Sequence, residues 1–345
     1  MVKTKKLLIL SIIIFFLFPL CFAECEVVLK SRPQPLRRGS RVAIMSLASP
    51  FSQEAIEKSA QIVREYFGYE PVLYPSSFVA RGYLTGKSDE AKAKELESAF
   101  KDPQIDGIIC IKGGYGSQRI IKYLNHEVIK ANPKVFMGFS DITALLGFLD
   151  NKCNMVTFHG PMTGTISRLV GKSEEQKKAT WLKWSKDIIE NPNLLPCKLH
   201  TGKTFIKIHG GKAEGEILGG NLTILASLVG TANQVNLDGK IVFFEDVGED
   251  TYKIERMLIQ LRDSGSFDNV RGFILGSFTD CKQPKGDQSI REIIDDVLVP
   301  LGKPIIAGVR AGHGKINYAI PFGVLTEIDG DKGTITFIDK ALKTK

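Results

Sequence analysis

The chain has 345 residues, of which 43% are hydrophobic and 24% are charged, and its formal net charge is +8. These fractions are those of a globular protein and exclude a disordered or fibrous chain. The positive charge is spread along the chain, which suits an anionic surface such as a cell envelope, and we expect no nucleic-acid partner.

Residues 1–23 have the features of a secretory signal peptide. Lys3, Lys5 and Lys6 precede an apolar run from 7 to 20, and a small-x-small cleavage site ends at Ala23. We predict cleavage near Ala23 and export to the periplasm or cell envelope. No later apolar stretch is long enough to span a bilayer, so we expect no stable membrane insertion after cleavage. Because residues 1–23 contain three lysines and no acid, cleavage lowers the net charge from +8 to +5.

Residues 36–165 alternate strand and helix signals in chain order. Strands are expected at 41–47, 71–74, 107–111 and 135–138, with a helix after Ser52, another over 89–100 and a third that Ser140-Asp141 begins. Repeated β-α-β units predict a parallel sheet covered on both faces, with functional sites beyond the carboxyl ends of its strands. Ser117 and Ser140-Asp141 are both expected at such ends.

The rest of the chain changes character twice. Residues 166–206 are rich in Lys, Asn and Pro and carry one amphipathic piece at 181–189, which indicates a connecting segment. Residues 207–345 predict a second, smaller domain of mixed α/β type. Its expected strands are at 240–245, 270–275, 304–308 and 334–338, with a helix over 252–262.

Five cysteines follow the predicted cleavage site. An odd number without Cys-x-x-Cys spacing argues against a disulfide framework and against a zinc site. A single disulfide between Cys153 and Cys197 stays open.

The most informative stretch is Gly113-Gly114-Tyr115-Gly116-Ser117. A serine on a glycine-rich turn between a strand and a helix is a typical nucleophile position, because the turn exposes the hydroxyl and the helix N-terminus offers N–H groups to an oxyanion. The stretch lacks the Gly-x-Ser-x-Gly pattern, so a glycine turn with a helix-capping serine is an equal alternative. Nucleotide binding is disfavoured, since neither Gly-Lys-Ser/Thr nor a dinucleotide fingerprint is present.

A serine nucleophile needs a histidine base and an acid that orients the histidine. His313 is the candidate base, because flanking glycines let its ring project from a loop after a predicted strand. His159 either shapes the site or makes a structural hydrogen bond. Glu245 closes an apolar strand and Asp246 follows it, so either could orient the base, or both could simply stabilise the next helix N-terminus.

Together these segments resemble the LD-carboxypeptidase family of serine peptidases, which includes murein tetrapeptide carboxypeptidases and microcin C self-immunity enzymes. The resemblance covers nearly all of residues 37–325. Its motifs occur in this order: Gly113-Gly114-Tyr115-Gly116-Ser117 with Arg119, Gly138-Phe139-Ser140-Asp141-Ile142-Thr143, His159-Gly160-Pro161, Gly219-Gly220-Asn221-Leu222, Phe244-Glu245-Asp246-Val247 with Glu249 and Tyr252, Gly312-His313, Asn317, and Pro321-Phe322-Gly323.

The resemblance implies an α/β fold with a flavodoxin-like, parallel-sheet N-terminal domain, a smaller mixed α/β C-terminal domain, and a Ser–His–Glu triad at their interface. By motif position the nucleophile is Ser117, the base His313 and the acid Glu245, with Asp246 as the open alternative to Glu245. The remaining implied site residues are Gln118 and Gly86 as oxyanion donors and Gly114, Tyr115, Arg119, Ser140 and Asp141 as substrate-binding residues. The family also implies a homodimer and neither a metal nor another cofactor.

The implied reaction is hydrolysis of the bond between the L-centre of a diamino acid and the terminal D-alanine in the tetrapeptide stem of peptidoglycan. One departure is the export signal, because family members that act on recycled murein peptides are expected in the cytoplasm. A microcin C-type peptidyl-nucleotide hydrolase is an alternative, although its toxin acts in the cytosol. A catalytically inactive murein-binding protein is another, against which the complete triad argues. The sequence leaves two questions about the substrate open. One is whether the stem contains diaminopimelate or lysine, and the other is whether free muropeptide or intact sacculus is cleaved.

Overall fold

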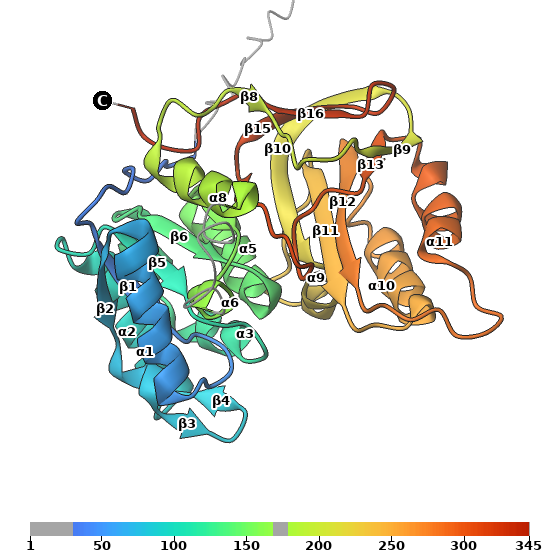
Figure 1. Cartoon of the computed structure of the whole chain (residues 1–345). Helices are drawn as coiled ribbons and strands as arrows, with labels where there is room; N and C mark the ends of the chain where they lie inside the picture. The colour runs from blue at the N-terminus through green and yellow to red at the C-terminus, as the bar shows by residue number, and fades with distance from the viewer. Residues whose placement is uncertain (1–29, 168–178, 345) are drawn as a thin grey trace, which may run out of the picture.

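The computed structural model describes residues 30–167 and 179–344. The predicted signal peptide at 1–23 lies outside these residues. No helix in the described part of the chain is both long and apolar enough to cross a bilayer. The described residues form two large sheets that lie beside one another with helices packed around them, and the helix α8 (Thr180–Glu190) lies on the path of the chain from the first sheet to the second (Figure 1).

The first sheet has six strands in the order β14-β7-β6-β5-β1-β2. Its strands are β1 (Arg41–Met45), β2 (Glu70–Leu73), β5 (Gly107–Cys110), β6 (Val135–Gly138), β7 (Thr157–His159) and β14 (Ile320–Phe322). The first five are parallel, as the alternating pattern predicts, and β14 runs antiparallel to β7. Every residue of β5 and β6 is buried, which parallel strands covered on both faces require.

The helices of this first part follow the expected order. They are α1 (Gln53–Ile62) with a π-helical extension (Val63–Phe67), α2 (Asp89–Lys101), α3 (Ser117–Ile120), α4 (His126–Lys130), α5 (Thr143–Cys153) and α6 (Thr163–Ile166). Ser52 caps α1 by accepting a hydrogen bond from the N–H of Ala55, and Ser88 caps α2 in the same way through Ala91. A short hairpin, β3 (Ala80–Arg81) with β4 (Leu84–Thr85), precedes α2.

The second sheet has eight strands in the order β8-β16-β15-β10-β11-β12-β13-β9. Its strands are β8 (Cys197–Lys198), β9 (Ile206–His209), β10 (Lys212–Asn221), β11 (Ile241–Val247), β12 (Gly272–Thr279), β13 (Ile305–Ala307), β15 (Leu325–Asp329) and β16 (Thr334–Phe337). The strands β10, β11, β12 and β13 are parallel, and the outer ones are antiparallel. Its helices are α9 (Leu222–Leu228), α10 (Thr251–Asp263) and α11 (Ile290–Val297). The α/β fold with a parallel-rich first sheet and a mixed second sheet is therefore confirmed.

Two features differ from the sequence-based expectation. The segment 166–206 contributes structure to both halves, because α8 (Thr180–Glu190) donates the indole N–H of Trp184 to the carbonyl of Ala319 at 2.7 Å, whereas β8 joins the second sheet. The strand β14 comes from the C-terminal part of the chain yet completes the first sheet. It is three residues long and contains Pro321, a residue that sheets accept at an edge.

The cysteines that the structure describes are all free: Cys110, Cys153, Cys197 and Cys281. The open alternative of a disulfide between Cys153 and Cys197 is therefore not realised.

Candidate active site

Ser140 occupies the turn between β6 and the helix α5. Its backbone φ is +64°, a left-handed conformation that few side-chain-bearing residues adopt. A serine held in this way between a strand and a helix has the geometry of a nucleophile elbow, in which the turn pushes the hydroxyl outward. Gly138 makes the turn possible, because a Cβ there would lie 2.8 Å from Cγ2 of Ile142.

His313 reaches this serine from the loop that follows β13. Its Nε2 lies 2.9 Å from Oγ of Ser140, and its Nδ1 lies 2.7 Å from Oε2 of Glu245. Gly312 must be glycine, since its φ is +108° and an added Cβ would lie 2.5 Å from Oε2 of Glu245. The N–H of Gly312 donates to Oδ1 of Asn317 at 2.9 Å, which fixes the loop.

Glu245 lies in β11 and is fully buried. Burial by itself raises the pKa of its carboxyl, but the imidazoles of His159 and His313 outweigh burial and lower that pKa to about 2. The carboxylate is therefore ionised at neutral pH and can hold the Nδ1–H of His313. Ser140, His313 and Glu245 form one continuous hydrogen-bonded line that joins the two sheets.

The side chain of Asp246 points away from His313, so of the two candidate acids Glu245 is the one that contacts the imidazole. Its carboxylate accepts hydrogen bonds from Nδ2 of Asn221 at 2.9 Å and from the N–H and hydroxyl of Thr223 at 2.9 and 2.8 Å. These hydrogen bonds direct the Asp246 carboxylate to the beginning of α9, whereas Glu245 contacts His313. Asp246 instead stabilises the beginning of α9.

The prediction that Ser117 is the hydroxyl paired with His313 is wrong. Ser117 is buried, its hydroxyl donates to the backbone carbonyl of Asp141, and its N–H donates to Oδ2 of Asp141 at 2.8 Å. Burial raises the pKa of the Asp141 carboxyl, while the N–H groups of Ser117 and Gly116 favour its charged form. Ser117 thus fastens the glycine-rich turn to the turn that carries Ser140.

The glycine-rich turn lies directly against the Ser140 hydroxyl. A Cβ added to Gly113 would lie 2.9 Å from Cβ of Ser140, 3.1 Å from its Oγ and 3.4 Å from the backbone N of Asp141. Gly114 adopts φ +112°, and a Cβ there would meet Oγ of Ser49 at 2.3 Å. Gly113 is required because its backbone passes close to Ser140, and Gly114 is required because its backbone passes close to Ser49 with a positive φ.

The predicted oxyanion donors are placed differently from the expectation. Gly86 donates its N–H to the carbonyl of Val79 at 2.8 Å, so this donor is already used by the loop that holds β3 and β4. Gln118 follows Ser117 rather than Ser140, and its expected role depended on Ser117 being the nucleophile. Ser140 is the serine that faces His313, and the backbone N–H directly after it is that of Asp141.

Two predicted substrate-binding residues, Arg119 and Tyr115, lie near the hairpin of β3 and β4. Arg119 donates from Nε to Oδ2 of Asp89 at 2.8 Å, and Arg81 binds the other oxygen of Asp89 at 2.7 Å. Arg119 is therefore part of a three-residue ion-pair cluster. Tyr115 is exposed and its ring lies 5.6 Å from that of Tyr83, also exposed.

One histidine for which the sequence leaves two roles open, shaping the site or making a structural hydrogen bond, lies beside Glu245. His159, the last residue of β7, is buried, and its Nε2 lies 3.8 Å from Oε1 of Glu245. Its signal in the sequence is a histidine at the end of a predicted strand. The matching position in β6 is Gly138, and Ser140 follows Gly138 by two residues.

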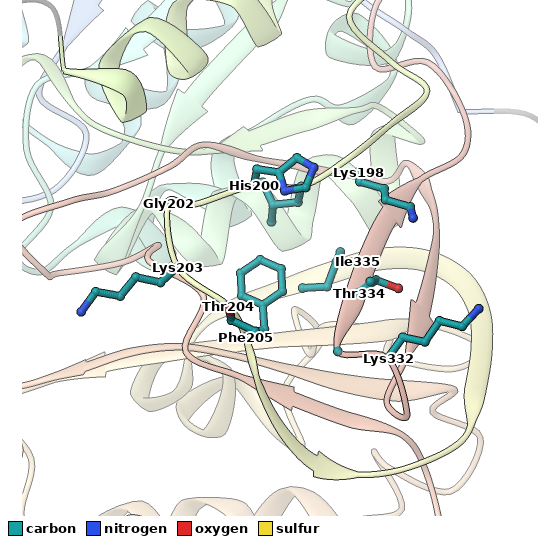
Figure 2. A pocket seen from close by; sticks show the side chains of 11 residues that line it. Lys198, His200, Gly202, Lys203, Thr204, Phe205, Lys332, Thr334 and Ile335 are labelled. Carbon is teal, nitrogen blue, oxygen red and sulfur yellow. The ribbon is translucent and has the colours of Figure 1, made fainter.

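A cavity of about 520 Å³ lies elsewhere, on the second sheet between the 198–205 segment and β16. Figure 2 shows Lys198, Thr334 and Lys332 along the strand β16 and Phe205 beside Ile335. Its lining contains none of the three residues of the hydrogen-bonded line. Within residues 30–167 and 179–344, no group of three or more His, Cys, Asp or Glu side chains is placed to hold a metal ion.

Family models, related sequences and a solved structure all show similarity to the same group of proteins. Residues 42–160 match the model of the LD-carboxypeptidase N-terminal domain, and residues 214–328 match that of the C-terminal domain. The chain is 31% identical to a murein tetrapeptide carboxypeptidase of Pseudomonas aeruginosa over 85% of this chain and 94% of that protein. It is 30% identical to the microcin C7 self-immunity protein of Escherichia coli over 90% and 96% of the two chains. The crystal structure of a muramoyltetrapeptide carboxypeptidase from Oxalobacter formigenes superposes with a TM-score of 0.75 at 25% identity, covering 88% of this chain and all of that one.

Proposed function

The chain belongs to the LD-carboxypeptidase family, and from this premise we propose that it is a serine carboxypeptidase acting on the tetrapeptide stem of peptidoglycan. The bond cleaved joins the L-centre of the stem's diamino acid to the terminal D-alanine. The observation that carries the proposal is the line from Ser140 through His313 to Glu245, with contacts of 2.9 and 2.7 Å.

In this mechanism Ser140 is the nucleophile. Its Oγ attacks the carbonyl carbon of the scissile amide while Nε2 of His313 takes the hydroxyl proton. Glu245 holds the Nδ1–H and stabilises the imidazolium that forms. The imidazolium then gives its proton to the leaving amine of D-alanine, and a water activated by His313 hydrolyses the acyl-enzyme. The product is a tripeptide stem.

The negative oxygen of the tetrahedral intermediate needs N–H donors. The N–H of Asp141 directly follows the nucleophile, and Gly113 of the Gly113-Gly114 turn packs so closely on Ser140 that an added Cβ would lie 3.1 Å from its Oγ. We assign the oxyanion hole to the Asp141 N–H and to an N–H of this glycine pair. The Ser117–Asp141 hydrogen bonds hold the two turns together, so the donors are fixed before substrate arrives.

Gly113→Ala is expected to lower kcat by about 10²- to 10³-fold, the effect of losing one oxyanion donor. The added methyl group would lie 2.9 Å from Cβ of Ser140, so the turn must shift away from the serine. Steady-state kinetics on tetrapeptide measure the loss. Gly210→Ala is the control, because the nearest atoms to its methyl group belong to the exposed side chain of Asp331, far from Ser140 in the second sheet's β9–β10 turn. Wild-type kcat in Gly113→Ala would contradict this oxyanion assignment.

Mass spectrometry of purified muropeptides tests the proposed reaction. Incubation with tetrapeptide is expected to release one D-alanine and to leave tripeptide, whereas tripeptide itself is unchanged. Pairs of diaminopimelate and lysine stems, each with and without the disaccharide, identify the preferred substrate. Tetrapeptide that stays intact while a fluorophosphonate labels the protein would contradict the peptidoglycan assignment and leave a serine hydrolase. Absence of labelling would favour the murein-binding alternative.

A microcin C-type peptidyl-nucleotide hydrolase is the second candidate, because the chain matches the microcin C7 self-immunity protein over nearly its whole length. The predicted export signal argues against it, since that toxin acts in the cytosol. The ratio of kcat/KM on tetrapeptide to kcat/KM on a peptidyl-nucleotide separates the two, and we expect it to favour tetrapeptide.

We also propose export with cleavage near Ala23, and assembly into a homodimer. Fractionation of cells is expected to find the mature chain in the periplasm or envelope, and light scattering of the purified mature chain is expected to give twice the monomer mass. Mature chain found in the cytosol would contradict export.

A further inference from the structure

His159 is a buried histidine that the triad mechanism does not use. Its ring is surrounded by three aromatic side chains, with centroid distances of 5.8 Å to Phe139, 5.1 Å to Phe243 and 5.4 Å to Phe322. Among the described residues, no hydrogen bond reaches either of its ring nitrogens. A buried imidazole without a partner is uncommon, because an unsatisfied polar group loses its hydration without compensation.

The second unsatisfied group lies next to it. Glu245 uses Oε2 to hold His313, whereas its other oxygen, Oε1, is buried and accepts no hydrogen bond from the described residues. Nε2 of His159 lies 3.8 Å from this Oε1. A buried carboxylate with an open oxygen is costly, and the ring nitrogen of His159 beside that oxygen is a potential donor to it. Hydrogen bonds between catalytic groups are often long without substrate and tighten when it binds.

The sheet explains why this contact matters for alignment. His159 pairs with Gly138 across the parallel strands β7 and β6, and Ser140 follows Gly138 by two residues. The strand pair that presents the serine therefore also presents His159. Glu245 comes from the second sheet and lies between the imidazoles of His159 and His313. The position of Glu245 relative to Ser140 is thus set by His159 on one side and by His313 on the other.

We propose that His159 is a positioning residue whose Nε2–H holds Oε1 of Glu245, so that Oε2 stays aligned on the Nδ1–H of His313. This inference rests on the proposed serine mechanism, although it does not depend on which amide is cleaved. No bond to substrate is made by His159. Its effect is exerted through Glu245 and then through His313.

Three substitutions of His159 distinguish a hydrogen-bond donor from an aromatic ring that only fills space in the core. His159→Phe keeps an aromatic ring among the three phenylalanines and removes the donor. His159→Gln carries an amide N–H near the position of Nε2, whereas His159→Asn carries the same amide too short to reach Glu245. We expect His159→Phe and His159→Asn to lower kcat by about 10- to 100-fold with little change in KM, as loss of an orienting partner does elsewhere. His159→Gln is expected to recover most of this loss.

The pH profile is the readout that a purely structural role would not move. The titratable groups facing Glu245 are His159 and His313, while Asp246 is directed to Asn221 and Thr223. Without His159, one of the two imidazoles that lower the pKa of Glu245 is lost and that pKa rises, so the further loss of kcat/KM that protonation of this carboxyl adds on the acidic limb is expected to begin at higher pH in His159→Phe. His159→Gln is expected to restore the wild-type limb.

The rate constant for fluorophosphonate labelling, measured against pH, gives the same comparison without a peptide substrate. Wild-type chain that labels but does not cleave tetrapeptide would overturn the proposed function and leave this test intact. Wild-type labelling rates and an unmoved acidic limb in folded His159→Phe would overturn the positioning role. If His159→Phe does not fold, equal rates in the Gln and Asn variants would overturn it instead.

Discussion

Replacing Ser140 by alanine is expected to lower kcat by about 10⁴- to 10⁶-fold, the range for removing the nucleophile of a serine triad. The hydroxyl of Ser140 is the one that lies 2.9 Å from Nε2 of His313. Alanine keeps the backbone turn and removes only Oγ, so the fold is retained. Circular dichroism checks the fold, and release of D-alanine from tetrapeptide measures the loss.

Ser117→Ala is the matched control, because Ser117 is also a serine after a buried strand and before a helix. It loses one hydrogen bond to the carbonyl of Asp141, which contributes about 1 kcal/mol to stability, and keeps its N–H bond to the Asp141 carboxylate. We expect kcat to stay within about tenfold of wild type, because the glycine-rich turn loses one hydrogen bond and some rigidity while the triad is unchanged. A fluorophosphonate adduct mapped to Ser117 rather than Ser140 would overturn the assignment.

The confusion of these two serines marks what the sequence can and cannot reveal. Both follow four-residue buried strands, and the glycines before Ser117 made its turn look like the better elbow. The decisive differences are the positive φ of Ser140 and the direction from which His313 arrives. The direction of His313 depends on how the loop after β13 packs against the first sheet, which no local pattern encodes. Gly113 instead permits close approach of its backbone to Ser140, and Gly114 permits close approach to Ser49.

Other parts were accessible from local patterns. Alternating strand and helix signals predicted the parallel sheet, because buried strands and amphipathic helices have distinct periods. His313 was selected by its flanking glycines and Glu245 by its place at the end of a strand. The choice between Glu245 and Asp246 stayed open, since strand alternation separates their faces without saying which face meets the histidine. The strand β14 was missed because three residues with a central proline carry no strand signal.

Glu245→Gln is expected to lower kcat by about 10⁴-fold while the fold is retained. The amide is nearly isosteric with the carboxylate, but it cannot stabilise the imidazolium and can present an N–H to Nδ1 of His313. That contact would favour the tautomer with the proton on Nε2, which cannot accept the proton of Ser140. Single-turnover kinetics on tetrapeptide measure the loss of the chemical step, and unchanged KM separates it from loss of binding.

The same variant is expected to change how stability depends on pH. The pKa of Glu245 is lowered from 4.5 to about 2, so the stabilisation of its charged form is fully present above pH 4.5 and is lost as pH falls toward 2. Relative to Glu245→Gln, the wild-type chain should lose about 3 kcal/mol of unfolding free energy over that interval. Asp246→Asn is the control: burial raises the pKa of that carboxyl, so wild type should gain stability relative to it as pH falls. Urea unfolding across this pH range measures both differences, and parallel curves for wild type and Glu245→Gln would show that the buried carboxylate is not held in its charged form.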